Sequence, residues 1–353
     1  MLLIRDLSVN LVNFKIENVS FEVFDKEIIA LLGDNGSGKT TLLNAIAGFV
    51  ELTSGSIIFD GVPISKETPN KRNIGYIFQD FALFPHMTVE ENIKYGLRFK
   101  KIENKELHFK NLVEFLKIGH LLKRFPTNLS GGEKQKVAIA RSLILDPKLI
   151  LFDEPTSQLS PTEKERIALE IKDIVKKFKK SAIYVTHNIE EANIVGDRIA
   201  IIENGKLLEI GKPIDIFYKP TNGSIARISE TNVIDAIVKE SANDFYIAYA
   251  SSVPFAILGD YKIFDKVKIF IRPEEIALSK EKIKTSAQNS FEGKIKKIIQ
   301  KGVLVKVRVS IKDEVELDAL ITRKSFEEME LKEGEAVFLY CKITSIHSFK
   351  EEL

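Results

Sequence analysis

A glycine-rich segment near the amino terminus carries the residues best suited to bind phosphate. Residues 33–40 read GDNGSGKT and match G-x-x-x-x-G-K-[ST]; they follow an apolar run at 28–32 and precede the helical stretch TLLNAIAGF. Glycines let backbone N–H groups approach phosphates, and a helix amino end adds a favourable dipole. We expect Lys39 to reach the β- and γ-phosphates of a nucleotide and Thr40 to ligate Mg²⁺. The predicted ATP-binding residues here are Gly33, Asn35, Gly36, Ser37, Gly38, Lys39, Thr40 and Thr41.

Two acidic residues, Asp153 and Glu154, directly follow the apolar run LILF at 149–152. In open α/β sheets, ligands bind at the carboxyl ends of the strands. Asp153 is therefore expected to hold Mg²⁺, and Glu154 is the candidate to polarise an attacking water. The alternative is that both acids only solvate the end of a strand.

A third segment, LSGGE at 129–133, opens a helical stretch. Ser130 and Glu133 have the spacing of a capping box. Gly131 and Gly132 would cost up to ~1 kcal/mol each relative to alanine in a helix. We therefore expect this first turn to present backbone N–H groups to an anion.

Short apolar runs alternate with helical stretches over residues 1–218. The runs are 28–32, 149–152, 181–185 and 199–202. Continuous apolar strands separated by helices imply a mostly parallel sheet covered on both faces. The predicted fold class of this part is α/β.

The pattern changes near residue 220. Alternate positions from Val303 to Ile311 are apolar, and so are alternate positions from Val337 to Ile343. A period of two is typical of half-buried antiparallel strands, which predicts a β-barrel. The predicted domains are residues 1–220, a linker at 221–232, and the barrel at 233–353.

LSGGE together with LILFDEPTS resembles the ABC ATPases over residues 1–218. The resemblance implies a P-loop NTPase cassette with a helical subdomain, and ATP and Mg²⁺ as ligands. It also implies a homodimer in which each ATP lies between the phosphate loop of one copy and Ser130, Gly131 and Gly132 of the other. One chain carries one of each motif, so a homodimer would close two equivalent sites.

The same resemblance extends to three single residues. Gln79, in IGYIFQD, matches the glutamine that contacts Mg²⁺ and the nucleophilic water, and His187, in YVTH, matches the histidine that contacts the γ-phosphate. Phe14 is the candidate to stack on adenine, with a core position as the alternative. The predicted catalytic residues are Glu154, His187 and Gln79, and the predicted metal ligands are Thr40, Gln79 and Asp153.

One position departs from the family pattern. Ser160 stands where the family usually has an aspartate, and with Pro161 and Glu163 it makes a helix start. The acidic contact that this aspartate makes across the dimer is therefore absent, while the helix cap is retained.

Residues 80–91 are apolar for a loop region and include Phe81, Leu83 and Phe84. Apolar anchors suit a groove that receives a partner helix, and in importers of this family the region accepts a helix of the permease. No run of about 18 apolar residues occurs, so we expect a separate membrane-spanning partner and a location on the cytoplasmic face of the membrane. The net charge of +2 argues against a nucleic-acid partner.

The carboxyl-terminal part resembles the accessory barrels, of the TOBE or MOP type, of importer ATPases. The segment IRPE at 271–274 and the segments FEGKI at 291–295 and ALITRKS at 319–325 carry this resemblance. It implies molybdate or tungstate as a ligand of the barrel, with Ser290, Lys342 and Thr344 as candidate donors. A tetrahedral dianion requires hydroxyl, cationic and N–H donors.

Together these patterns predict the ATP-hydrolysing subunit of an ABC importer for molybdate or tungstate, served indirectly by an extracytoplasmic substrate-binding protein. Sulfate, a sugar or another solute is the alternative cargo. An ABC ATPase acting on ribosomes or DNA, and an oxyanion-binding storage protein with a non-transport cassette, are the alternatives of other classes.

Overall fold

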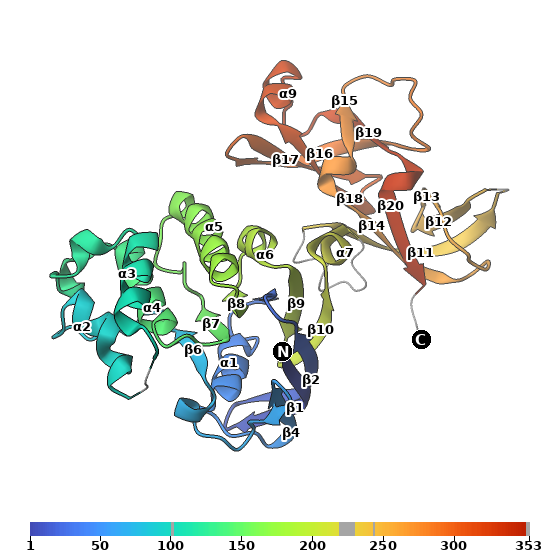
Figure 1. The fold of residues 1–353 in the computed structure, drawn as a ribbon. Helices are drawn as coiled ribbons and strands as arrows, with labels where there is room; N and C mark the ends of the chain where they lie inside the picture. The colour runs from blue at the N-terminus through green and yellow to red at the C-terminus, as the bar shows by residue number, and fades with distance from the viewer. Residues whose placement is uncertain (100–101, 219–229, 243, 351–353) are drawn as a thin grey trace. The chain divides into compact units, whose positions relative to one another are not determined.

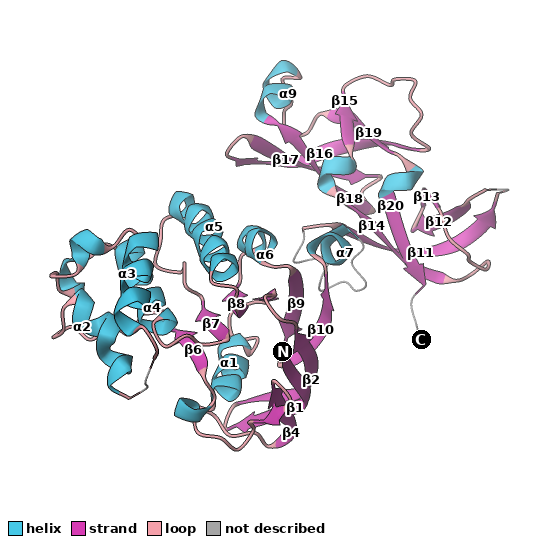
Figure 2. Ribbon diagram, viewed as in Figure 1, coloured by secondary structure: helices cyan, strands magenta, loops and turns pink. Residues whose placement is uncertain are grey.

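The computed structural model describes residues 1–99, 102–218, 230–242 and 244–350. The chain divides into two compact units, Met1–Ile216 and Phe217–Leu353. Most of the predicted linker, residues 221–232, lies outside the described residues. Figure 1 and Figure 2 show the helices and strands of each unit.

The first unit is built around a six-stranded sheet with the order β10-β9-β3-β8-β7-β6. β3 pairs in parallel with β8 and β9, and β7 pairs in parallel with β6 and β8, as the continuous apolar runs predict. Only β10 runs antiparallel, against β9. The strands are β3 (Ile28–Leu32), β6 (Ile74–Ile77), β7 (Leu149–Asp153), β8 (Ser181–Thr186), β9 (Arg198–Glu203) and β10 (Lys206–Gly211).

A second, antiparallel sheet has the order β2-β1-β4-β5. Its strands are β1 (Leu2–Leu11), β2 (Phe14–Val23), β4 (Ser54–Phe59) and β5 (Val62–Pro63). Side chains of both sheets and of helix α1 (Lys39–Ala47) share one buried cluster. The helix that follows the glycine-rich segment is therefore anchored between two sheets.

Helices between residues 89 and 195 share an apolar core with the opposite face of the parallel sheet. The α-helices are α2 (Val89–Lys94), α3 (Lys105–Phe115), α4 (Gly131–Leu143), α5 (Pro161–Lys177), α6 (Ile189–Val195) and α7 (Pro213–Tyr218). Short 3₁₀ helices are η1 (Pro69–Lys71), η2 (Tyr95–Arg98), η3 (Gly119–Leu121) and η4 (Pro126–Asn128).

The second unit consists of two five-stranded antiparallel sheets around one core, in keeping with an OB-like barrel. One sheet has the order β13-β12-β11-β14-β20 and the other β15-β19-β16-β17-β18. The elements are β11 (Asn232–Ser241), β12 (Tyr246–Ala250), β13 (Val253–Ile257), β14 (Lys266–Ile271), η5 (Pro273–Glu275), β15 (Ala277–Ser279), β16 (Asn289–Lys301), β17 (Leu304–Ile311), β18 (Val315–Thr322), α9 (Arg323–Glu328), β19 (Ala336–Cys341), η6 (Ile343–Ser345) and β20 (Ile346–Lys350).

The period-two pattern was right for the buried apolar positions of β17, but Lys306 and Ser310, which alternate with them, are buried as well. Val305, Val307 and Val309 are buried, whereas Val303 is 79% exposed because it lies in the turn before the strand. Cys341, on β19, is buried, and its burial raises the pKa of the thiol to about 12.

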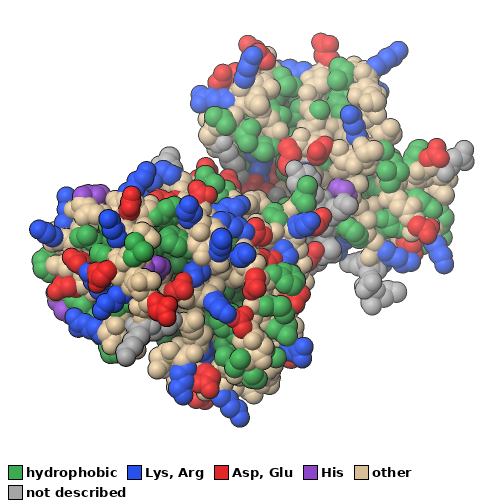
Figure 3. Space-filling model, viewed as in Figure 1, with side chains coloured by type: hydrophobic (Ala, Val, Ile, Leu, Met, Phe, Trp, Pro, Cys, Tyr) green, Lys and Arg blue, Asp and Glu red, His purple; other side chains and the backbone are tan. Residues whose placement is uncertain are grey.

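The surfaces agree with the near-neutral composition. Figure 3 shows acidic and basic side chains interspersed over the visible face of the first unit. Within the described ranges, no helix is both long and apolar enough to cross a membrane.

Candidate functional site

Parallel pairing brings four predicted segments to one edge of the central sheet. Leu32, the last residue of β3, pairs with Thr186, and Asp153 pairs with Val185. The glycine-rich segment follows β3, Glu154 follows β7 and His187 follows β8, so all three lie at the same edge of the sheet. β6 lies on the other side of β7, where Ile77 pairs with Phe152. Gln79 and Glu154 each come two residues after this pair, so they lie at the same level.

The glycine-rich segment forms a tight loop that ends in helix α1. Gly36 and Gly38 have φ angles of 81° and 107°, in the left-handed region that glycine adopts most readily. Gly38 is the residue before α1, so the first N–H groups of the helix face the loop. The hydroxyl of Ser37 is buried and has no hydrogen-bond partner among the described residues, which leaves it available for a ligand oxygen.

Lys39 is the most deeply buried cation of the loop. Its ammonium donates to the carbonyl oxygens of Gly33 and Asp34, at 2.8 Å each. Burial lowers the pKa of Lys39, although Glu154, Asp34 and Asp153 oppose the shift. The ammonium of Lys39 lies 3.9 Å from the carboxylate of Glu154.

Asp153 is held by two side chains from other elements. Thr40, at the start of α1, donates to its Oδ1 at 2.9 Å, and Tyr76, on β6, donates to its Oδ2 at 3.1 Å. The Tyr76 hydroxyl also lies 3.0 Å from the amide oxygen of Asn44. Burial raises the pKa of Asp153 in spite of both hydrogen bonds.

Glu154 links the loop to the end of β8. Its φ is 44°, a strained backbone conformation for a residue with a side chain. Its second carboxylate oxygen lies 3.4 Å from Nδ1 of His187, whose side chain is 43% exposed. A cation, a carboxylate and an imidazole from three separate elements thus lie within one small region.

A cavity of about 330 Å³ opens beside these groups. Phe14, at the start of β2, lies over Gly38 so closely that a Cβ there would come within 2.8 Å of its ring. The ring is half-buried and forms one wall of the cavity. The lining residues are Phe14, Asn35, Gly36, Gly38, Lys39, Thr40, Thr41 and Glu154. Gln79 is exposed and does not line this cavity.

The LSGG segment starts helix α4 as the sequence predicts. Ser130 and Glu133 form a reciprocal capping box, with hydrogen bonds of 2.8 Å and 2.9 Å to the Glu133 carboxylate. Ser130 is exposed, and Gly131 and Gly132 are half-exposed, so this turn is accessible from outside its own unit. Ser160 caps α5 in the same way, through the carboxylate of Glu163.

The predicted docking anchors separate into different environments. Phe84 lines an apolar groove of about 890 Å³, together with Tyr76, Phe78, Tyr95, Phe99 and Arg141 among others. Leu83 packs against the helical core instead of lining the groove. The prediction for Phe81 was wrong: its side chain is 1% exposed, because φ angles of 63° at Phe81 and 46° at Ala82 turn it inward.

Arg141, on α4, holds this turn in place. It donates to the carbonyl oxygens of Ala82 and Phe81, at 2.7 Å and 2.9 Å, and its guanidinium lies 5.3 Å from the centre of the Phe84 ring. Burial lowers the pKa of Arg141. The helix that begins at the LSGG segment therefore also contacts the groove.

The three candidate oxyanion donors of the barrel are all exposed. Ser290, on β16, lines a cavity of about 560 Å³ together with Lys294, Ser310 and Lys312. Lys342 and Thr344 lie at η6 and do not line that cavity. The structure thus does not gather the three residues into one cavity.

Sequence reasoning missed three polar residues near the site. Tyr76 contacts Asp153, and Asn44 contacts Tyr76. Glu191, on α6, accepts hydrogen bonds from residues close to Glu154 and His187 in the sequence. The only signal for Tyr76 is its position in a strand next to β7. Nothing in the residue pattern sets Glu191 apart from a helix-capping acid.

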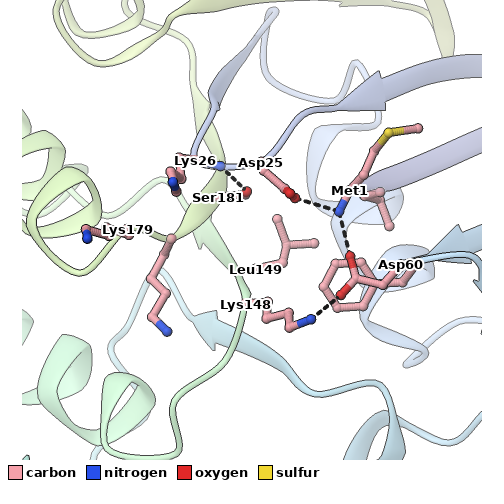
Figure 4. Close-up of a pocket in the computed structure, with 11 residues that line it drawn as sticks. Met1, Asp25, Lys26, Asp60, Lys148, Leu149, Lys179 and Ser181 are labelled. Carbon is pink, nitrogen blue, oxygen red and sulfur yellow. Dashed lines mark hydrogen bonds and ion pairs between the residues drawn. The ribbon is translucent and has the colours of Figure 1, made fainter.

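A further cavity, of about 350 Å³, lies at the opposite ends of the strands (Figure 4). The amino group of Met1 contacts Asp25 and Asp60 at 2.8 Å and 2.6 Å, and Lys148 contacts Asp60 at 2.6 Å. These charges are mutually paired, and the cavity shares no residue with the site described above.

Residues 16–157 match the family described as ABC transporter, and residues 285–348 match the TOBE domain. A relative from Pyrococcus abyssi, named molybdate/tungstate import ATP-binding protein WtpC, is 39% identical over 355 residues, with 99% of this chain and 100% of the relative covered. A relative from Desulfitobacterium hafniense, named spermidine/putrescine import ATP-binding protein PotA, is 35% identical over 291 residues, with 82% and 81% covered. A solved dimeric ATP-binding cassette with ADP and Pi bound has a TM-score of 0.53 and 28% identity, over 60% of this chain and 99% of that one.

Proposed function

The chain belongs to the ABC transporter ATP-binding proteins, and from this premise we propose how its residues bind and hydrolyse ATP to drive import through a separate permease. The observation that carries the proposal is the convergence of three side chains: Glu154 lies 3.9 Å from Lys39, with which it lines the cavity, and 3.4 Å from His187.

The phosphates of ATP bind in the glycine-rich loop. The backbone of Gly36 and Gly38 presents N–H groups, and the amino end of α1 adds its dipole. Lys39 exchanges its bonds to Gly33 and Asp34 for the β- and γ-phosphates. Asn35, Ser37 and Thr41 complete the binding loop, and the half-buried Phe14 ring offers a stacking surface for adenine.

Thr40 and Asp153 are the residues that would hold Mg²⁺ beside the phosphates. Their oxygens lie 2.9 Å apart, and a hydroxyl with a carboxylate is a donor set that magnesium favours when phosphates complete its coordination. The ion neutralises charge on the β- and γ-phosphates when bound. Gln79, two residues after the end of β6, is the third residue proposed to contact Mg²⁺.

Glu154 orients the water that attacks the γ-phosphorus and accepts its proton, and ADP leaves from the opposite side. His187 contacts the γ-phosphate and keeps Glu154 in position across their 3.4 Å contact. The half-exposed LSGG turn of a second copy closes over the nucleotide, so a homodimer completes two sites.

The apolar groove beside Phe84 receives a cytoplasmic helix of the permease. Aromatic side chains with a few charged neighbours, Arg141 and Lys71, suit a helix-in-groove contact. Of the anchors predicted from the sequence, Phe84 contacts the permease helix, whereas Phe81 only supports the turn. The subunit therefore works at the cytoplasmic face of the membrane.

Molybdate or tungstate is the proposed cargo. The Pyrococcus relative with this named cargo aligns over the full chain, including the barrel, whereas the spermidine/putrescine relative aligns over less of it. The extracytoplasmic substrate-binding protein and the permease select the solute directly. Uptake of labelled molybdate, tungstate or spermidine by proteoliposomes with the complete transporter would separate the cargoes, and uptake of spermidine alone would refute the oxyanion assignment.

Substitution of Glu154 by glutamine tests the hydrolytic role. Glu154→Gln is expected to lower ATP turnover by about 10²- to 10⁴-fold, the usual contribution of a general base, and to accumulate ATP-bound dimers in light-scattering measurements. Glu165→Gln, at an exposed acid of α5, is the matched control and should behave as wild type. Unimpaired turnover in Glu154→Gln would contradict the assignment.

A further inference from the structure

Glu191 is the most completely buried acid near the site, and no step proposed above uses it. Its side chain is 1% exposed. It lies in the first turn of α6, directly after β8 and His187 (Figure 1). No salt bridge joins it to a cationic side chain among the residues that the structure describes.

Three hydroxyl groups converge on one oxygen of this carboxylate. Oε2 of Glu191 accepts from Thr156 at 2.7 Å, from Tyr184 at 3.0 Å and from Thr186 at 3.0 Å. All three donors are themselves buried. An oxygen that accepts three hydroxyl donors fixes the positions of all three groups relative to one another.

The donors come from the two segments that carry the hydrolytic pair. Thr156 lies two residues after Glu154, and Thr186 immediately precedes His187. Thr186 also accepts the backbone N–H of Asn188 at 3.0 Å, which fixes the turn that contains His187. One buried carboxyl group therefore joins the segment after β7 to the segment after β8.

We propose that Glu191 is a positioning residue for hydrolysis, which sets the 3.4 Å contact between Glu154 and His187 by holding Thr156 and Thr186 together. This inference rests on the proposed hydrolytic roles of that pair. The hydrogen bonds of Glu191 reach neither the glycine-rich loop nor α1, where most of the proposed ATP-binding residues lie. Its loss should therefore affect the chemical step far more than nucleotide binding.

The test replaces Glu191 by glutamine, which has nearly the same shape but brings an NH₂ group, a donor, toward the three hydroxyl groups. Glu191→Gln is expected to lower kcat by about 10- to 100-fold, the range typical of small misplacements in an active site. The KM for ATP should change by less than about twofold, as expected when ground-state binding is intact. ATPase rates are measured on the full chain with its permease. They are divided by the concentration of ATP-binding sites found by titration, so that unfolded protein does not lower the kcat.

Two comparisons separate positioning from general stability. Glu190→Gln changes the exposed neighbour on the same helix and should leave kcat and KM as in wild type. Thr156→Val removes one donor and should lower kcat less than Glu191→Gln. The double variant should be no worse than Glu191→Gln alone, because the two residues act through one contact.

Each outcome is decisive. A kcat per binding site equal to that of wild type in Glu191→Gln overturns the inference while leaving hydrolysis intact. Additive effects of Glu191→Gln and Thr156→Val also overturn it. If Glu191→Gln fails to fold, Thr156→Val with unchanged kcat has the same consequence. Absence of ATP hydrolysis by the wild-type complex would instead refute the proposed function itself.

Discussion

Asp153 shows how a site residue depends on neighbours that no motif contains. Thr40 comes from the recognised loop, but Tyr76 comes from an adjacent strand and is braced by Asn44. Partners that orient a metal-binding carboxylate usually tune metal affinity strongly. If Asp153 holds Mg²⁺ as proposed, Tyr76 belongs functionally to the same site, although it does not line the nucleotide cavity.

Removal of this hydroxyl should weaken magnesium binding. We expect Tyr76→Phe to raise the Mg²⁺ concentration for half-maximal ATPase activity by about tenfold, at the lower end for loss of an orienting partner. Titration of activity with Mg²⁺ at saturating ATP measures the effect. Tyr249→Phe loses a hydroxyl bond to Glu240 in the other unit and serves as the control. An unchanged Mg²⁺ requirement would contradict this role.

The motif residues at the strand ends could be predicted because their chemistry and spacing are local. The loop from Gly33 to Thr41, Glu154 and His187 each follow a buried strand, and Asp153 ends one. Parallel pairing brings these strand ends to the same edge of the sheet. Tyr76 and Glu191 could not be predicted, because their contacts depend on which strands and helices become neighbours. Those contacts are set by tertiary packing and carry no sequence spacing of their own.

At the scale of elements, α4 connects the two surfaces for which we proposed contacts with a second copy and with the permease. Its first turn carries the LSGG segment, and Arg141 near its other end binds the inward turn at Phe81 and Ala82. The sequence indicated apolar anchors here, but it could not reveal the positive φ angles that bury Phe81. A loop conformation stabilised by a distant arginine is invisible to local patterns.

Arg141→Lys is expected to reduce stimulation of ATPase activity by the permease by about 2- to 30-fold, the range for residues that couple two sites. Lysine keeps the charge but cannot donate to both carbonyl oxygens in the fixed geometry of a guanidinium. Comparing turnover with and without the permease measures this change. Arg166→Lys on α5 is the control, and full stimulation in Arg141→Lys would exclude the coupling role.

In the barrel, β17 and β18 are joined by a charge pair. Arg308 lies opposite Asp318 and donates to both carboxylate oxygens, at 2.7 Å and 2.9 Å. Burial alone would raise the pKa of Asp318, but the bonds from Arg308 and the nearby Lys306 lower it. The carboxylate therefore stabilises the fold above about pH 4, the pKa of an unfolded aspartate, and loses this effect as pH falls further.

Asp318→Asn should lower the free energy of unfolding at neutral pH. It should also make this free energy depend less on pH below about pH 4. Urea unfolding followed by circular dichroism at several pH values would measure both effects. Glu316→Gln, which removes an acid only 4.0 Å from Arg308, is the milder control. An Asp318→Asn profile parallel to that of wild type down to pH 2 would contradict the lowered pKa.

At the scale of the whole molecule, the barrel is the candidate site at which the transported oxyanion would regulate ATP hydrolysis. If cytoplasmic oxyanion binds the barrel and favours one arrangement of the dimer, binding must be linked to turnover. Ser290 lines a cavity that contains two lysines, whereas Lys342 and Thr344 lie at η6. The resemblance supplied these three residues. Ser290 pairs with Tyr340, two residues before Lys342, but which of the three would line a cavity could not be read from their order in the chain.

Saturating molybdate or tungstate is expected to lower the ATPase activity of the complete transporter. Substitution of both Ser290 and Lys342 by alanine should relieve the inhibition, and calorimetry of the full chain against molybdate, tungstate and sulfate should rank the anions. Glu190→Gln serves as a variant with unaltered response. Activity that is insensitive to all three anions would remove the regulatory role and leave the transport function standing.

The burial of Cys341 has a practical consequence for measuring dimer closure. The chain contains one cysteine, and its buried, weakly acidic thiol should resist maleimide reagents at neutral pH. A cysteine introduced at an exposed position such as Glu165 could therefore be labelled selectively in the otherwise native chain. Spin or fluorescent probes attached there would report distances between two copies through the ATP cycle.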